Sequence, residues 1–298
     1  MDSYVIGSLN MDMVVAVGHI PKRGETIFAD QYFENCGGKG ANQAVACAKL
    51  GSKVKMIGKV GKDGFGKQMI ENLQANGVEE SFVTVSDSTN SGIAMIIIHD
   101  GDNRIILDKG ANYQLTEEDI DAGLSDAVDG DLLIMQLEIP IEIVYHALQI
   151  AKSKKMRTLL NPAPAKQLNR ELLGLVDMIV LNETEAEIIT GITEEEQWIK
   201  ALQKLGISSI VLTLGEKGAI VYENSLCTKI PARKVEVVDT TAAGDTYIGG
   251  IAYSMQQGSN LVEACKFASV AASITVTRQG ASKSIPTLAE VISVMSKG

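Results

Sequence analysis

The stretch VVDTTAAGDTYIGG, residues 237–250, contains residue types suited to phosphoryl transfer. Two threonines and two alanines follow Asp239 and precede Gly244 and Asp245, where a helical pattern begins. Small side chains let successive backbone N–H groups converge on an anion at the start of a helix. Asp245 would then lie beside that anion and accept the proton of an attacking hydroxyl. A carboxylate that only caps the helix explains Asp245 equally well, so this stretch alone leaves both interpretations open.

A second patch, ENCGGKGANQA (residues 34–44), is suited to binding a polyol. Its three glycines, among them Gly38, let the backbone approach a ligand closely. Lys39 and Asn42 offer hydrogen-bond donors, and Asn42 also offers an acceptor. An ordinary glycine turn before a helix is the alternative interpretation of this patch.

A third patch, NETE (Asn182–Glu185), follows a predicted strand. It places an amide and a carboxylate at the edge of the sheet, where they suit a hydrated Mg²⁺ ion and phosphate oxygens, because Mg²⁺ keeps most of its waters and uses few protein ligands. A capping box that opens the next helix explains the same residues, and taken in isolation the patch favours that interpretation.

The elements that must position these patches follow an α/β rhythm. From about residue 113 onward, apolar strands such as DLLIMQLEIP alternate with helices such as IEIVYHALQIAKSKK. This order predicts a mostly parallel sheet covered by helices on both faces, with ligands beyond the carboxyl ends of the strands. Residues 11–35 and 92–109 are β-rich and partly polar and do not fit the rhythm. We expect them to form a small separate sheet, a lid on an α/β domain of residues 1–10, 36–91 and 110–298.

Composition and charge exclude several classes of protein. The chain has 298 residues, of which 45% are hydrophobic and 21% charged, and this balance predicts a globular fold rather than disorder. A formal net charge of −10 disfavours nucleic-acid binding. The four cysteines show no metal or redox spacing, and the N-terminus does not read as a signal peptide. No apolar stretch is long enough to span a membrane, so we expect a cytoplasmic protein.

Other catalytic motifs have little support. GKDGFGKQ, residues 61–68, nearly matches a P-loop, but Gln68 lacks the hydroxyl that binds Mg²⁺ in that motif. The three histidines have no metal-binding spacing, and no G-x-S-x-G nucleophile elbow is present.

Taken together, the patches resemble the ribokinase family of carbohydrate kinases over almost the whole chain. GGKGANQA resembles the family's N-terminal signature, and DTTAAGDTY resembles its C-terminal signature D-T-x-A-A-G-D-x-F, with Tyr247 where Phe is usual. LNPAPA and NETEAE also match. The resemblance implies a three-layer α/β/α sandwich with a mostly parallel sheet of roughly nine strands. It also implies a β-sheet lid and a homodimer that forms through this lid.

The resemblance further implies ATP-dependent phosphorylation of D-ribose at its 5-hydroxyl, under a lid that excludes water. It assigns Asp245 as the general base and Ala242, Ala243 and Gly244 as the anion hole for the γ-phosphate. The implied ribose positions are Asn10, Asp12, Gly38, Lys39, Asn42 and Glu138, together with Asp245. The implied nucleotide positions are Asn182, Thr213, Gly215, Gly218, Gly244 and Ser269, with Glu185 in the Mg²⁺ region. The implied K⁺ site comprises Asp239, Thr241, Thr275, Arg278, Gly280 and Ser284.

Two other functions remain open at this point. A kinase of another pentose or of a nucleoside, such as deoxyribose or adenosine, would share these motifs. Asn10 and Asp12 can both bind hydroxyls, which favours a fully hydroxylated sugar. A non-catalytic sugar or nucleotide sensor on the same fold is disfavoured, because Gly244 and Asp245 are both present.

Overall fold

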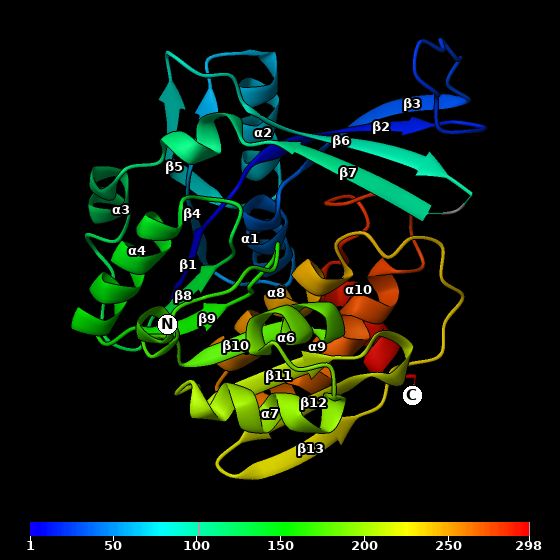
Figure 1. The fold of residues 1–298 in the computed structure, drawn as a ribbon. Helices are drawn as coiled ribbons and strands as arrows, with labels where there is room; N and C mark the ends of the chain where they lie inside the picture. Colours follow the sequence, from blue (N-terminus) through cyan, green and yellow to red (C-terminus); the bar gives the residue numbers. More distant parts are fainter. Residues whose placement is uncertain (101, 298) are drawn as a thin grey trace.

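Nine strands form the central sheet in the order β13-β12-β11-β10-β9-β8-β1-β4-β5 (Figure 1). The computed structural model describes residues 1–100 and 102–297. Neighbouring strands from β5 to β11 are parallel, and β12 and β13 continue the sheet in antiparallel pairs. The strands are β1 (Ser3–Ile6), β4 (Val54–Gly61), β5 (Glu79–Ser86), β8 (Leu132–Met135), β9 (Arg157–Leu160), β10 (Met178–Asn182), β11 (Ser209–Thr213), β12 (Ala219–Glu223) and β13 (Leu226–Ile230). The predicted mostly parallel sheet is confirmed.

Helices cover both faces of this sheet, which explains why its strands are apolar without alternation. In β1, Val5 packs into the cluster beneath α1, α2, α8 and α9, whereas Tyr4 and Ile6 pack into the cluster beneath α3 to α7. The predicted three-layer sandwich is therefore confirmed. The helices are α1 (Lys39–Lys49), α2 (Gly64–Ala75), α3 (Glu117–Gly123), α4 (Ile141–Ser153), α5 (Arg170–Leu173), α6 (Glu183–Thr190), α7 (Glu195–Lys204), α8 (Ala243–Gln256), α9 (Leu261–Thr275) and α10 (Leu288–Met295), with short 3₁₀ turns η1 (Gly110–Gln114) and η2 (Gly215–Lys217).

A second, smaller sheet projects from this sandwich (Figure 1). Its strand order is β3-β2-β6-β7, with one parallel pair, β2 and β6, between two antiparallel pairs. The strands are β2 (Asn10–Ala16), β3 (Gln31–Gly37), β6 (Gly92–His99) and β7 (Asp102–Asp108). The expected small sheet is present, with β2 and β3 in one β-rich segment and β6 and β7 in the other.

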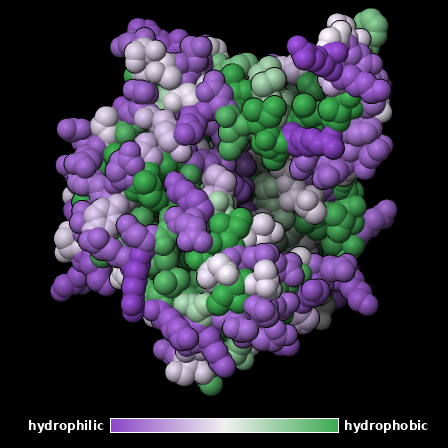
Figure 2. All heavy atoms as spheres, in the orientation of Figure 1, coloured by the Kyte–Doolittle hydropathy of each residue, from purple (hydrophilic) through white to green (hydrophobic). Residues whose placement is uncertain are grey.

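The second sheet carries several exposed apolar side chains. Figure 2 shows a hollow below β6 and β7, with apolar side chains gathered on the sheet above it. Met95, Ile105, Ile106 and Leu107 each expose more than two fifths of their surface. Within the described residues, no helix is long and apolar enough to cross a membrane.

Candidate active site

Several of the predicted site residues lie at the carboxyl ends of the parallel strands, as expected for this class of fold. Asn182 and Thr213 end β10 and β11 and are paired neighbours in the sheet. Glu138 follows β8, and Asn10 begins β2 after the short loop that leaves β1. Residues far apart in the chain therefore meet here.

Two of the predicted sugar residues, Asn10 and Lys39, hydrogen-bond to the carboxylate of Glu138. Its Oε2 accepts hydrogen bonds from Ser8 Oγ at 2.5 Å, from Asn10 Nδ2 at 3.2 Å and from the backbone N–H of Lys39 at 3.3 Å. Asn112 Nδ2 donates to Asn10 Oδ1 at 2.8 Å and fixes the orientation of that amide. These side chains thus hold one another in a polar cluster before any sugar binds.

Two glycines of the GGKGANQA patch are required by close backbone packing. Gly38, the residue before α1, has a φ of 89°, and a Cβ added there would lie 2.7 Å from the backbone nitrogen of Asn10. A Cβ on Gly40 would lie 2.6 Å from the backbone of Gly7 and Ser8. The patch is therefore more than an ordinary turn, because these glycines let α1 approach β1 and β2.

Asp245 does not cap its helix. The N-cap of α8 is Ala242, which has a left-handed backbone with φ 61° and makes no side-chain capping bond. Asp245 is instead buried, with 8% of its surface exposed, and its carboxylate accepts hydrogen bonds from Asn42 Nδ2 at 3.3 Å and Gln43 Nε2 at 3.0 Å. The helix-capping interpretation is therefore wrong. The carboxylate of Asp245 faces Asn42 and Gln43 of α1.

The start of α8 leaves two of the three predicted anion-hole amides free. Ala243 N–H donates to Thr240 O at 3.2 Å, so it is engaged in the turn. The N–H groups of Ala242 and Gly244 donate no hydrogen bond to any described residue. Gly244 is exposed, and a Cβ there would meet nothing within 4 Å, so a ligand has room beside this amide.

Several carboxylates surround Lys39. Burial by itself would lower the pKa of Lys39, but these carboxylates raise it. They belong to Asp245, Glu138, Glu185 and Asp12. Burial, reinforced by the charges of Glu138 and Asp245, raises the pKa of Asp12 from 3.8 to about 7. The site is therefore an acidic cluster around one lysine, which suits a polyol with many hydroxyl donors.

An unpaired acceptor beside Asp245 also suits a polyol. Asn42 Oδ1 is buried, and no described residue donates a hydrogen bond to it. A buried polar atom without a partner costs free energy, which a sugar hydroxyl would recover.

In the NETE patch the structure shows the capping box. Asn182 Oδ1 accepts from Glu185 N at 2.8 Å, and Glu185 Oε2 accepts from Asn182 N at 2.9 Å. Burial, the largest influence, raises the pKa of Glu185 despite this bond and the nearby Lys39. Of the other predicted nucleotide residues, Thr213 is the strand neighbour of Asn182. Gly215 begins the turn η2 and Gly218 follows it, with positive φ values of 54° and 99°. Ser269 lies in the helix α9 and not at a strand end. Within the described residues it forms no hydrogen bond with the other predicted nucleotide residues.

The predicted K⁺ residues form a linked loop. Asp239 accepts from Thr241 N at 2.8 Å, from Thr241 Oγ1 at 2.6 Å and from Gly280 N at 2.9 Å. Burial alone would raise the pKa of Asp239, but these bonds lower it. Arg278 turns its side chain to Glu290, with Nη2 and Oε1 2.5 Å apart. The structure thus joins Asp239, Thr241 and Gly280.

The remaining two predicted K⁺ residues make other hydrogen bonds. Thr275 Oγ1 donates to Thr246 Oγ1 at 2.9 Å, and Ser284 Oγ donates to Ala281 O at 2.7 Å.

Sequence reasoning missed five polar residues of the site: Ser8, Gln43, Asn112, Gln136 and Asn161. All five are buried, with at most 9% of their surface exposed. Gln43 and Asn161 lie inside the motifs GGKGANQA and LNPAPA. Gln136 directly follows the apolar strand β8. A polar residue at the carboxyl end of a buried strand is the signal that would have identified Gln136 and Asn161.

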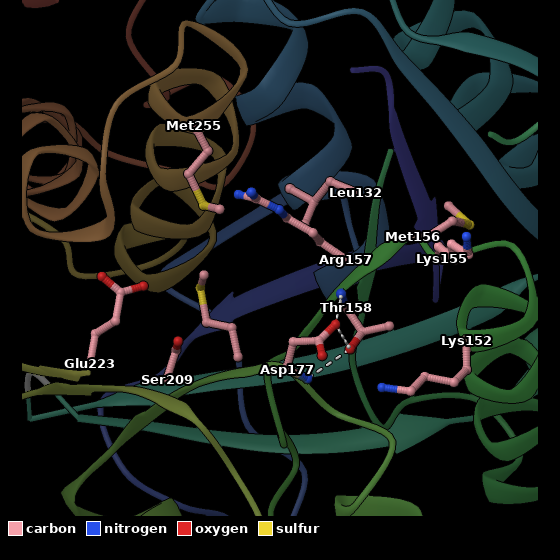
Figure 3. Close-up of a pocket in the computed structure, with 11 residues that line it drawn as sticks. Leu132, Lys152, Lys155, Met156, Arg157, Thr158, Asp177, Ser209, Glu223 and Met255 are labelled. Carbon is pink, nitrogen blue, oxygen red and sulfur yellow. Dashed lines mark hydrogen bonds between the residues drawn. The ribbon is translucent and has the colours of Figure 1, made fainter. Parts of the chain in front are cut away.

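A separate cavity of about 470 Å³ lies at the opposite edge of the sheet (Figure 3). It is lined by the first residues of β8 to β11, which are Leu132, Arg157, Met178 and Ser209. Its Asp177 carboxylate accepts from Thr158 N and Oγ1 at 2.9 and 3.0 Å. None of the predicted site residues lines this cavity, so it is not where the chemistry gathers.

Comparisons with known proteins agree with the fold and the motifs. The family model described as "pfkB family carbohydrate kinase" matches residues 2–288. A ribokinase of Haemophilus influenzae is 40% identical over 294 residues, covering 97% of this chain and 96% of the relative. A deoxyribokinase of Salmonella typhi is 40% identical with the same coverage. The structure of Arabidopsis thaliana ribokinase complexed with ribose and ATP has a TM-score of 0.89 at 31% identity, covering 99% of this chain and 98% of that one. The chain therefore belongs to the pfkB family of carbohydrate kinases.

Proposed function

We propose that the protein phosphorylates D-ribose at O5 with ATP, giving D-ribose 5-phosphate and ADP. The observation that carries this proposal is the position of Asp245. Its buried carboxylate lies at the start of α8, within hydrogen-bond distance of Asn42 and beside the exposed amide of Gly244. Whole-length similarity to a ribokinase, and to the ribokinase solved with ribose and ATP, supports ribose and ATP as the substrates.

In the proposed reaction the protein mainly positions groups and stabilises charge. The carboxyl groups of Asp12 and Glu138 and the amide of Asn10 form hydrogen bonds with the sugar hydroxyls, and Asn42 Oδ1 gains the donor that it lacks. Asp245 accepts the proton of the 5-hydroxyl as its oxygen forms a bond to the γ-phosphorus and the bond to ADP breaks. Gly244 N–H and the start of α8 stabilise the negative charge of the transferring group. The second sheet covers the sugar and limits attack by water.

The residues present also fit the two cations. Mg²⁺ bound to ATP oxygens would neutralise phosphate charge, and oxygens of Glu185 and Asn182 would accept hydrogen bonds from its waters. A K⁺ ion would be held by oxygens of Asp239, Thr241 and Gly280, which Asp239 joins, together with oxygens of Thr275, Arg278 and Ser284. The half-buried Asp239 carboxylate, kept charged by its hydrogen bonds, suits a cation there.

A kinase of 2-deoxyribose is the second candidate, because the Salmonella typhi deoxyribokinase is as similar as the ribokinase above. The two functions differ in how much the 2-hydroxyl contributes. A polar site loses a large part of its binding energy when a hydroxyl partner is missing. A comparison of kcat/KM for ribose, 2-deoxyribose and adenosine therefore decides between them, and we expect ribose to be preferred.

We also propose a cytoplasmic homodimer that forms through the second sheet. The exposed apolar side chains of β6 and β7 support the dimer, since pairing would remove them from water. Four free cysteines suit a reducing compartment.

The test is a coupled ADP-release assay with ATP, Mg²⁺, K⁺ and ribose. Asp245→Asn is expected to lower kcat at least about 100-fold, the scale of general base catalysis, while ribose binding in calorimetry is kept. The matched control is Asp177→Asn at the other edge of the sheet, which should keep its turnover. Near-normal turnover in Asp245→Asn removes Asp245 from the chemistry, and absence of turnover with every sugar in the wild-type protein removes the proposed activity.

A further inference from the structure

A chain of buried amides connects Asp245 to the strands of the sheet. Gln43 Nε2 donates to Asp245 Oδ1 at 3.0 Å and to Asn161 Oδ1 at 3.3 Å. Gln43 Oε1 accepts from Gln136 Nε2 at 2.5 Å, and Asn161 Nδ2 donates to Val180 O at 3.0 Å. Gln43 has no exposed surface, and Gln136 exposes 1%. These side chains therefore exchange hydrogen bonds with protein atoms and not with bulk water.

The orientation of every amide in this chain follows from two groups that can only accept. The carboxylate of Asp245 must face the NH₂ group of Gln43, because a carboxylate has no proton to donate. The carbonyl of Val180 must likewise face the NH₂ group of Asn161, which turns Asn161 Oδ1 toward Gln43. Gln43 Oε1 is then left to face Gln136, which must present its own NH₂ group. One arrangement satisfies all of these contacts.

This arrangement leaves one group unsatisfied. Gln136 Oε1 is buried without a described donor, and it lies against Gly7, where an added Cβ would be 2.0 Å away. A buried acceptor without a partner lowers stability, so the amide chain is poorly explained as a device for stability alone.

We propose that Gln43 and Gln136 are positioning residues for phosphoryl transfer. Gln136 fixes the orientation of the Gln43 amide, and Gln43 in turn holds Oδ1 of Asp245. The other oxygen of Asp245, Oδ2, receives only the 3.3 Å bond from Asn42 and faces the sugar hydroxyl. The inference rests on the proposed role of Asp245 as the base. It goes beyond that role because neither glutamine touches the sugar or the nucleotide in the proposed mechanism.

The first test replaces the donor without changing the size of the side chain. Gln43→Met is expected to lower kcat by about 10- to 100-fold, the cost of a misplaced catalytic group, while KM for ribose and ATP changes less than about threefold. The control is Gln256→Met in the same helix as Asp245, where Gln256 Nε2 donates to Ser3 Oγ at 2.8 Å at the far end of α8. This variant should keep wild-type kcat.

The second test changes Gln136, which does not touch Asp245. Gln136→Met removes the donor to Gln43 Oε1 and is expected to have a smaller effect than Gln43→Met. Gln136→Glu introduces a carboxyl group that donates a hydrogen bond when neutral but only accepts when ionised. The ionised form therefore draws the NH₂ group of Gln43 toward itself and turns the Gln43 oxygen toward Asp245. Turnover of Gln136→Glu should therefore fall with rising pH over a range in which wild-type turnover does not.

The outcomes separate this inference from the proposed function. If Asp245→Asn is inactive while Gln43→Met stays within about twofold of wild type, only the positioning role is overturned. If Gln43→Met does not fold, as judged by thermal unfolding, the pH profile of Gln136→Glu decides, and a profile parallel to wild type overturns the proposal. A loss of ribose affinity in Gln43→Met without a loss of kcat also overturns it, because that pattern indicates a binding residue.

Discussion

Replacing Asp12 by asparagine should change how the stability of the protein depends on pH. Asp12 lies on β2 with 8% of its surface exposed. Its Oδ2 lies only 2.1 Å from the point where a Cβ on Gly37 would be, so the carboxyl occupies space that a glycine leaves free. Burial and the nearby charges of Glu138 and Asp245 raise the pKa of Asp12 from 3.8 to about 7.

The size of the effect follows from this pKa difference. The folded and unfolded values differ by about three pH units, and each unit corresponds to about 1.4 kcal/mol, so ionising Asp12 in the folded protein costs up to about 4 kcal/mol. Between pH 4 and pH 7 the folded state keeps a proton that the unfolded state has released. The free energy of unfolding therefore falls as pH rises through this window, and the contribution is constant above it.

Urea unfolding of wild type and Asp12→Asn at several pH values between about 4.5 and 8 measures this effect. The variant should gain stability relative to wild type as pH rises, by up to about 4 kcal/mol, because its amide does not ionise. Asp87→Asn, a change at an exposed carboxylate, is the control for the loss of one charge. Parallel stability profiles of wild type and Asp12→Asn would refute the reasoning. They would mean that Asp12 has the same pKa in the folded and the unfolded protein.

Three further predictions concern the glycine patch, the cation loop and the dimer. Gly38→Ala should lower Tm by several degrees, because a non-glycine residue at φ 89° costs about 1–3 kcal/mol and its Cβ would meet backbone atoms. Gly64→Ala is the control and should keep the wild-type Tm, because a Cβ there meets open space. Equal Tm values for the two variants would contradict this prediction. Asp239→Ala loses three hydrogen bonds and should lower kcat about tenfold and abolish any activation by K⁺, so an unchanged K⁺ titration would argue against the cation loop. Ile106→Asp should convert a dimer into a monomer in light scattering, and an unchanged mass would place the dimer contact elsewhere.

The sequence by itself determined the class of fold, and it predicted most of the residues of the proposed site. Apolar strands alternating with helices predicted the parallel sheet, because strands covered on both faces need no polar side. The β-rich segments that broke this rhythm predicted the second sheet. Glycines and small residues in GGKGANQA and DTTAAGDTY marked the places where backbone must come close to a ligand or to another strand, and Gly38 does meet the backbone of Asn10.

Only the tertiary structure decided what Asp245, Asn182 and Glu185 do in the folded chain. The sequence left open whether Asp245 caps its helix or acts beside a bound phosphate. Its hydrogen bonds to α1 exclude the cap, and they come from residues more than 200 positions away in the sequence. The other two form the capping box that local sequence favoured. The amides of Gln43 and Gln136 and the raised pKa of Asp12 were invisible in the sequence. Each depends on distances between residues remote in the chain and on removal from water, and neither quantity exists until the sheet and its helices have packed.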